Sequence, residues 1–345
     1  MGANSKISWT DHTFNPWRGC SKVHEGCANC YAEREAHRFP SNRGIWGPNG
    51  TRVMASADMW MQPIKWNKKA AAGVCQTCDG NRYVPTQRRL DPKTEKVPDD
   101  MVPCQTYKAT GKVESYRARV FCASLADVFE QWDGPIHDHN ERKLWQSIRG
   151  VRAIEPDDES PGFAFERRPL TMDDLRERLF AMIDATPNLD WMLTTKRPEN
   201  IRRMWRDDRA GFRSALVWHR PNLWLLTSVS MQKHYDEQWP HMEKCRDLCP
   251  VIGISAEPLL GPIDVGPRNE GAMVPDWVIV GGESGPHAKA RKMELEWARS
   301  LRDQCNANAI PFHFKQHGEH MPEGINDQRD LNGVFWNEFP KGATR

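Results

Sequence analysis

The stretch DWMLTTKRP, residues 190–198, sets the pattern on which the predicted fold rests. After Asp190 it continues with apolar and β-branched residues and then changes to Lys196 and Arg197, just ahead of Pro198. A short apolar run that ends in polar residues is typical of a strand buried on both faces of a sheet. The chain continues as PENIRRMWRD, which favours a helix. We therefore predict a strand, a loop with two basic side chains, and a helix.

The same unit recurs along the chain. Further strands are predicted at residues 6–11, 119–127, 223–230, 250–258, 276–284 and 311–319. Further helices are predicted at residues 30–39, 171–185, 232–245 and 293–308. Strands that alternate with helices of this length form parallel sheets. The sequence therefore predicts an α/β protein, a full or partial TIM-like (β/α) barrel formed by residues 1–345 as one domain, with its chemistry at the carboxyl ends of the strands.

The composition is that of a soluble globular protein. Of the 345 residues, 39% are hydrophobic and 27% are charged, and no apolar run is long enough to span a membrane. The first residues, MGANSKISWTDHTF, lack the apolar core of a secretory signal, so we expect a cytoplasmic protein with no membrane partner. A formal net charge of +2 neither requires nor excludes a nucleic-acid partner. Ten cysteines in a cytoplasmic chain favour metal binding or catalysis over disulfides.

Two segments interrupt the alternation of strands and helices. Residues 73–115 are rich in Lys, Pro and Asp, and residues 134–168 contain the acidic sequence IEPDDESPG. Both are predicted to be insertions into the barrel, the second of them a solvated acidic loop.

The first insertion contains an internal repeat, because CQTCDGNRYV at residue 75 returns as CQTYKATGKV at residue 104. Two Cys-x2-Cys motifs are typical of a zinc site that stabilises a small hairpin. Tyr107 stands in the place of the fourth cysteine. Cys75, Cys78 and Cys104 therefore form either a degenerate site or a zinc site completed by another residue such as Cys122.

A second cysteine group, Cys20, Cys27 and Cys30, lies between a predicted strand and a predicted helix with the spacing Cys-x6-Cys-x2-Cys. Structural zinc normally takes four protein ligands, so one interpretation adds His24 to the three thiolates. The other is a [4Fe–4S] cluster bound through three irons, whose fourth iron is open to S-adenosylmethionine. The cluster is favoured because the loop opens a series of βα units whose strand ends carry polar groups.

Long segments of the chain resemble the phage-encoded three-Cys-motif protein family, which is similar to radical S-adenosylmethionine enzymes. The matching segments are ISWTDHTFNPWRGCSKVHEGCANCYAE, LTTKRPENI, ISAEPLLGPID, DWVIVGGESGP, WARSLRDQC and PFHFKQHGE. The resemblance implies a TIM-like barrel with Cys20, Cys27 and Cys30 as ligands of a [4Fe–4S] cluster, and a location in the host cytoplasm. Two features depart from the radical-enzyme pattern: the cysteine loop is three residues longer than Cys-x3-Cys-x2-Cys, and Asn29 stands where an aromatic residue is usual.

Polar residues at the predicted strand ends complete the candidate site. Lys196 and Arg197 could receive the carboxylate of S-adenosylmethionine or a substrate phosphate. Glu257 and Glu283 could bind the cofactor amino group or a ribose hydroxyl, or accept a substrate proton. The candidate catalytic residues are Glu257, Glu283 and Lys196, and the candidate cofactor-binding residues are Gly281, Gly282, Ser284, Arg197 and Ser228.

The function that these features favour is that of a radical S-adenosylmethionine-like enzyme that modifies or repairs nucleic acid or nucleotides. Such an enzyme needs a protein that donates electrons. Two alternatives remain open: a non-redox zinc protein that interacts with nucleic acid, and a metal-assisted hydrolase that uses Asp127, Glu257 and Glu283.

Overall fold

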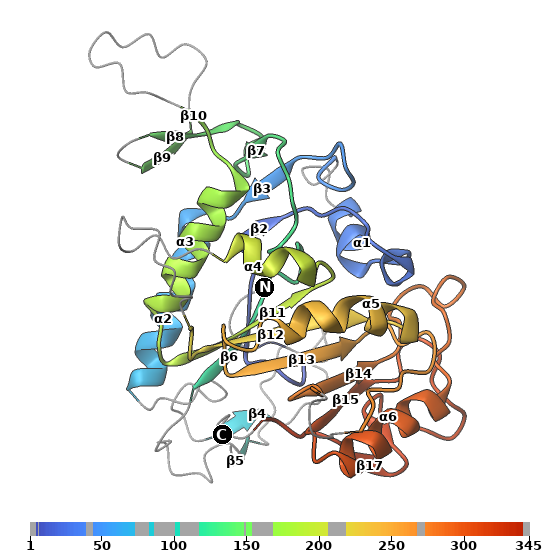
Figure 1. Ribbon diagram of the computed structural model, residues 1–345. Helices are drawn as coiled ribbons and strands as arrows, with labels where there is room; N and C mark the ends of the chain where they lie inside the picture. The colour runs from blue at the N-terminus through green and yellow to red at the C-terminus, as the bar shows by residue number, and fades with distance from the viewer. Residues whose placement is uncertain are drawn as a thin grey trace, which may run out of the picture.

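The computed structural model in Figure 1 shows a mixed α/β fold built around one large sheet. The residues that the structure describes are 5, 7–38, 44–72, 83–85, 101–103, 117–147, 150–153, 168–205, 219–267 and 273–340. Within these ranges no helix is both long and apolar enough to cross a membrane.

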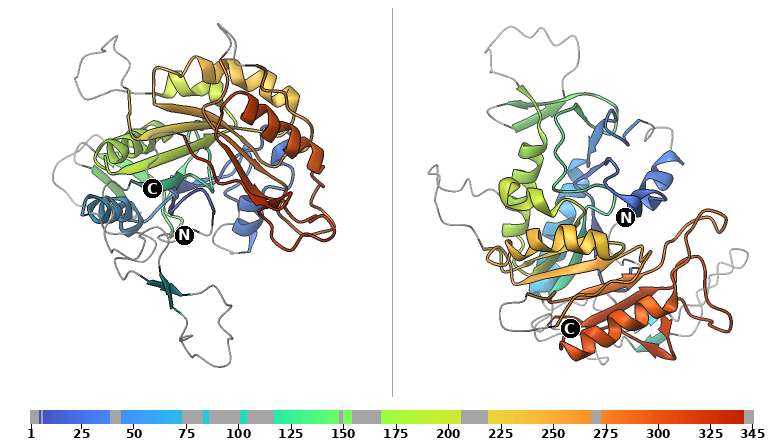
Figure 2. Two further views of the ribbon diagram at one scale, coloured as in Figure 1. Left: turned by 90° about the horizontal axis from the view of Figure 1, so that it is seen from below. Right: turned by 45° about the vertical axis from the view of Figure 1, so that its right-hand side comes forward.

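The large sheet has seven strands, and all neighbouring strands are parallel. In spatial order, which is also chain order, they are β1 (His12–Phe14), β6 (Ala118–Cys122), β11 (Leu189–Thr195), β12 (Leu223–Val229), β13 (Val251–Ala256), β14 (Val278–Gly281) and β15 (Phe312–Gln316). Among the described residues, β1 and β15 are the two edges of this sheet and do not pair with each other. The sheet therefore curls into a half-barrel, as the left view of Figure 2 shows, and does not close.

Helices flank the convex face of the half-barrel (Figure 2). These helices are α2 (Ala57–Ala71), α3 (Met172–Asp184), α4 (Ile201–Met204), α5 (Gln232–Glu243) and α6 (Leu295–Ala307). In the described ranges, helix α1 (Tyr31–His37) does not contribute to the core that they form with the sheet, and its Ala36 packs with Ile45 and Val53 instead. The start of α3 is fixed by a capping box, in which Thr171 and Asp174 bond to each other's backbone amides. The helix thus starts directly after Thr171, in agreement with the helix that the sequence predicts at residues 171–185.

The strands alternate between two apolar layers because successive side chains point to opposite faces. On β12, Leu225 packs in the large core between sheet and helices, whereas Trp224 and Leu226 face the concave side. The concave layer also contains Trp9 from the N-terminal segment, with its ring 6.3 Å from that of Trp277. The interior of the half-barrel is thus filled by side chains of the strands together with Trp9 from outside the sheet.

The first strand lies further along the chain than the sequence predicts. Residues 7–11 form a turn, and the strand is His12–Phe14, which pairs with β6. The Thr10 hydroxyl donates to the Arg119 carbonyl and accepts from the Phe121 amide, so this turn bonds to the sheet through a side chain. The predicted strand at residues 6–11 is therefore wrong in position.

Several small sheets surround the half-barrel. One joins β2 (Trp17–Arg18), β3 (Arg52–Met54) and β7 (Ile136–His137), another joins β8 (Leu144–Ser147), β9 (Gly150–Ala153) and β10 (Arg168–Pro169), and a third joins β16 (Asp330–Leu331) and β17 (Val334–Phe335). Residues 134–168, expected to be a loop, thus contain short strands, while the sequence IEPDDESPG itself lies outside the described residues. In the first insertion, β4 (Tyr83–Pro85) pairs antiparallel with β5 (Met101–Pro103), and Cys75, Cys78, Cys104 and Tyr107 lie outside the described residues.

Candidate functional site

A cavity of about 610 Å³ opens at the carboxyl ends of the parallel strands. Its wall combines the cysteine loop with residues that end or follow strands β6, β11, β12, β13, β14 and β15. The predicted site residues in its lining are Cys20, Cys27, Cys30, Lys196, Arg197, Ser228, Glu257, Gly282, Glu283 and Ser284. Gly281, the last residue of β14, is not in the lining. The other cysteines that the structure describes, Cys122, Cys245, Cys249 and Cys305, are buried away from this cavity.

The cysteine loop has defined local structure between Cys20 and Cys30. His24 caps a short 3-10 helix, Glu25–Cys27, by accepting a hydrogen bond from the Gly26 amide at 3.0 Å. Cys30 is the residue that precedes helix α1. Cys27 thus ends the 3-10 helix and Cys30 directly precedes α1. All three cysteines of the loop are half-buried.

One end of the loop is bound to the sheet by a buried ionic network. Arg197 donates to the Cys20 sulfur at 3.6 Å, to the Ser21 carbonyl at 2.8 Å and to Asp127 at 3.0 Å. Glu130 accepts from the Ser21 amide at 2.9 Å, and it pairs with an arginine of β3 whose side chain is fully buried. Burial and the nearby carboxylates Glu130 and Asp127 raise the pKa of Cys20 to about 12. Without a bound cation, this thiol is therefore protonated at neutral pH.

The other end of the loop is bound to the segment after β14. Asn29 donates to Glu283 at 2.9 Å and to the Lys289 carbonyl at 2.8 Å. Arg291 bonds to the same Glu283 carboxylate and to the carbonyl of Glu25. Burial would raise the pKa of Glu283, but hydrogen bonds from Arg291 and Asn29 outweigh burial and lower it. Glu283 is thus an ionised carboxylate whose oxygens are already engaged by the protein.

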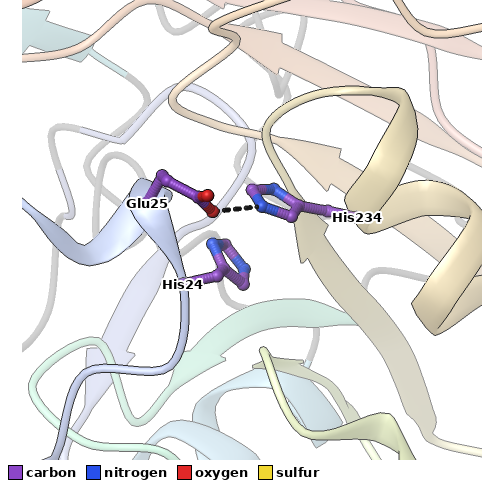
Figure 3. A group of neighbouring side chains, drawn as sticks. All are labelled: His24, Glu25 and His234. Carbon is purple, nitrogen blue, oxygen red and sulfur yellow. Dashed lines mark hydrogen bonds and ion pairs between the residues drawn. The ribbon is translucent and has the colours of Figure 1, made fainter.

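His24, Glu25 and His234 form a close group beside this loop, drawn in Figure 3. Their potential ligand atoms all lie within 4.8 Å of one another, and His234 Nε2 lies 2.8 Å from Glu25 Oε2. The two imidazole rings are stacked, with centroids 3.9 Å apart. Burial, His234 and Lys196 lower the pKa of His24 to about 4, so this ring is neutral at pH 7.

This group is poorly suited to a metal ion. The Nδ1 atoms of His24 and His234 both accept hydrogen bonds from backbone amides, those of Gly26 and Ser230. A neutral imidazole that accepts at Nδ1 carries its hydrogen on Nε2, and that nitrogen then has no lone pair for a metal. Ligating histidines normally donate through the second nitrogen instead. In the described part of the chain, no close group of potential ligands joins His24 to the three thiols, so the arrangement lends no support to a Cys3His zinc site.

The strand ends that line the cavity carry a second chain of polar groups. Lys196 Nζ donates to Ser228 Oγ at 2.8 Å, and Ser228 Oγ donates to the Glu257 carbonyl at 3.1 Å. The Glu257 carboxylate forms an ion pair with Lys315. Of the three carboxylates considered for a hydrolytic metal, Asp127 and Glu283 bond to arginines and only Glu257 faces a lysine. Among the described residues these three do not form a close ligand group.

Sequence reasoning missed several residues that shape the site. Glu130 and Arg52 form the buried pair next to Ser21, and Arg291 bonds to Glu283. Arg34 lines the cavity from α1. A usable signal existed only for Arg34, which follows Cys30 by four residues and so lies on the same face of the helix. Arg52 and Glu130 are 78 residues apart in sequence. Arg291 is 8 residues from Glu283 but 266 residues from Glu25, whose carbonyl it also contacts.

Comparison with known proteins gives a family and no activity. No curated protein and no solved structure matches the chain. A family model described as "Protein of unknown function (DUF5131)" matches residues 4–153 and 167–340. Because this match covers most of the chain, the protein belongs to the DUF5131 family.

Proposed function

We propose that the protein is an iron–sulfur enzyme that uses S-adenosylmethionine, in which Cys20, Cys27 and Cys30 bind a [4Fe–4S] cluster. The observation that carries the proposal is that three thiols from one loop line the same cavity as the polar ends of the parallel strands. In a curled parallel sheet this edge is where ligands bind. The partial TIM-like barrel and the resemblance to the phage three-Cys-motif family favour the same proposal.

The donor set fits a multi-iron cluster better than a single ion. A zinc ion needs four ligand atoms that converge on one point, whereas each thiolate of an iron–sulfur cluster binds its own iron. The three thiols do not form a close group of the kind made by His24, Glu25 and His234. His24, the expected fourth zinc ligand, already caps a helical turn. When bound, a reduced cluster of this kind supplies one electron to the sulfonium of S-adenosylmethionine and so generates an adenosyl radical.

The residues of this chain would position the cofactors and the substrate. Arg197 donates to the Cys20 sulfur and so offsets part of the thiolate charge. Glu283 and Asn29 fix the part of the loop that carries Cys27 and Cys30. Lys196, Ser228 and the ion pair of Glu257 with Lys315 lie at the strand ends that line the same cavity, where they can bind a ligand or move a proton. Gly282 and Ser284 also line this cavity.

Nucleic acid or a nucleotide is the substrate class that we propose, with a separate protein as the electron donor. The lysines and arginines of the cavity wall support an anionic substrate. Zinc binding by Cys75, Cys78 and Cys104 stays a prediction.

The proposal is tested by purifying the protein without oxygen. We expect a brown protein with about four irons per chain, and release of 5'-deoxyadenosine when a reductant and S-adenosylmethionine are added. Cys27→Ala should lose both properties. Cys305→Ala, which changes a buried cysteine of α6 outside the cavity, should keep them.

The zinc alternative predicts a different result for the same preparations. A colourless protein with one zinc per chain, lost on His24→Ala, would overturn the cluster proposal. Retention of iron in His24→Ala supports it, because His24 then serves only as a cap.

A further inference from the structure

Two cations in the cavity wall have no anionic partner within the described part of the chain. The other charged groups of the wall are compensated: Arg197 pairs with Asp127, Lys315 with Glu257, Arg329 with Asp327, and Glu283 with Arg291. Lys196 and Arg34 line the cavity without such a pair. A cleft with uncompensated positive charge favours an anionic ligand.

Lys196 is placed by its surroundings to present its ammonium group. Its backbone amide donates to Asp127 at 3.0 Å, and its Nζ donates to Ser228 at 2.8 Å. A lysine ammonium has three hydrogens to donate, so two remain for a ligand. Thr194, which projects from the same face of β11, also lines the cavity, and its buried hydroxyl has no hydrogen-bond partner among the described residues. An unused hydroxyl next to unused ammonium hydrogens is a site for an oxyanion.

Arg34 approaches the cavity from helix α1, on the side of the cysteine loop. A Cβ atom at Gly285 would lie 2.7 Å from its Nη1, so the glycine leaves the space that the guanidinium occupies. No ion pair of Arg34 is present among the described residues. Arginine in such a position suits the planar, two-point binding of phosphate oxygens.

We propose that the cavity binds a phosphate monoester of nucleotide size, with its phosphate on Lys196 and Thr194 and with Arg34 as the second cation. A phosphate monoester carries between one and two negative charges at neutral pH, which matches two unpaired cations better than a carboxylate does. The cavity volume of about 610 Å³ is that of a small-molecule site. The identification of this ligand as the substrate rests on the proposed function, whereas the binding of a phosphate monoester does not.

The test is the binding of cytidine 5'-monophosphate to the full-length protein by calorimetry, before and after metal removal. Cytidine is used because it does not resemble the adenosyl group of the proposed cofactor. We expect the nucleotide to bind at least about tenfold more tightly than cytidine, and Lys196→Met to remove about tenfold or more of this affinity. Lys196→Arg should retain most of it. Lys292→Met, which removes an exposed lysine outside the cavity, is the matched control and should change nothing.

Equal binding of nucleotide and nucleoside, or an unchanged affinity in Lys196→Met, overturns the proposal. Binding of S-adenosylhomocysteine tests whether Lys196 binds the carboxylate of the proposed cofactor instead of a phosphate. If Lys196→Met weakens S-adenosylhomocysteine and leaves the nucleotide unaffected, the cation binds the cofactor carboxylate and the phosphate assignment is wrong. An unchanged nucleotide affinity in Arg34→Met overturns the role of Arg34. A protein that binds the nucleotide as expected but contains no iron would refute the proposed function and leave this inference standing.

Discussion

Arg197 and Cys20 are joined by a hydrogen bond of 3.6 Å between Nη1 and Sγ. Arg197 follows strand β11, whereas Cys20 belongs to the loop that precedes α1, so the bond joins the loop to the half-barrel. The remaining donors of Arg197 point to Asp127, Glu130 and the Ser21 carbonyl. Because its guanidinium is engaged by protein groups, we expect Arg197 to act on a cofactor through Cys20 and not by binding a cofactor carboxylate itself.

Arg197→Met should lower the reduction potential of the proposed cluster. Hydrogen bonds to cluster sulfurs stabilise the more negative, reduced form. A bond worth about 1 kcal/mol corresponds to a shift on the order of 50 mV for one electron. The measurement is a redox titration followed by electron paramagnetic resonance. Arg202→Met, which removes an exposed arginine paired with Asp247, is the control and should leave the potential unchanged. An unshifted potential in Arg197→Met at full iron content would contradict the role given to this bond.

Asn29→Ala should loosen the part of the loop that carries Cys27 and Cys30. Its side chain supplies two hydrogen bonds, to Glu283 and to the Lys289 carbonyl, and each is worth about 1 kcal/mol. We expect faster amide hydrogen exchange in residues 25–31 and a slower or incomplete uptake of iron. Exchange in strand β12, which does not contact Asn29 through either bond, should be unaffected. Equal exchange rates for the loop in both proteins would show that Arg291 and His234 fix it without Asn29.

The parallel sheet could be predicted because its strands carry a strong local signal. In β11 and β12 every residue except Asp190 and Ser228 is apolar or β-branched, as expected for strands covered on both faces. The first strand has only three residues, too few for such a signal, and the prediction chose the preceding turn instead. In this turn the Thr10 hydroxyl forms the hydrogen bonds to β6 that backbone groups would form in a strand. The spacing of apolar residues in the sequence does not indicate such side-chain bonds.

The site was predictable where the chemistry lies within one segment. The three cysteines share a loop, and Lys196 and Ser228 end strands that were recognised. The bonds that position them are long-range: Asn29 and Glu283 are 254 residues apart, and Arg52 and Glu130 are 78 apart. A single sequence contains no signal for such pairs, since each partner alone resembles an ordinary surface residue.

Gly26→Ala should displace the cysteine loop, because a Cβ atom at this position would collide with Ser230 Oγ and approach His24 Cε1 to 2.9 Å. Overpacking of this kind costs about 1–3 kcal/mol. The free energy of unfolding, measured in urea, should fall by that amount. The double variant Gly26→Ala with Ser230→Ala should recover part of it, since the colliding oxygen is gone while His24 remains. Ser230→Ala alone should be close to neutral, because this hydroxyl is buried without a partner among the described residues. If the double variant is no more stable than Gly26→Ala, the collision does not limit the loop.

Asp190 should make the protein less stable as the pH rises from about 4 to about 6. Its side chain is buried in β11, and burial raises its pKa from 3.8 to about 6 despite the opposing effect of Arg117 and Arg119. Between these values the folded protein retains a proton that the unfolded chain has lost, so the free energy of unfolding decreases with increasing pH. A shift of this size corresponds to about 3 kcal/mol.

Replacing Asp190 with Asn removes the titrating group, so the difference in unfolding free energy between variant and wild type should grow in favour of the variant across this interval. Urea denaturation at a series of pH values measures it. Asp247→Asn is a control of opposite sign, because a hydrogen bond from Arg202 lowers the pKa of that exposed carboxyl and its stabilising effect is lost as the pH falls. If the unfolding free energies of wild type and Asp190→Asn remain parallel from pH 4 to pH 7, Asp190 titrates at its ordinary pKa, and attraction to Arg117 must fully offset its burial.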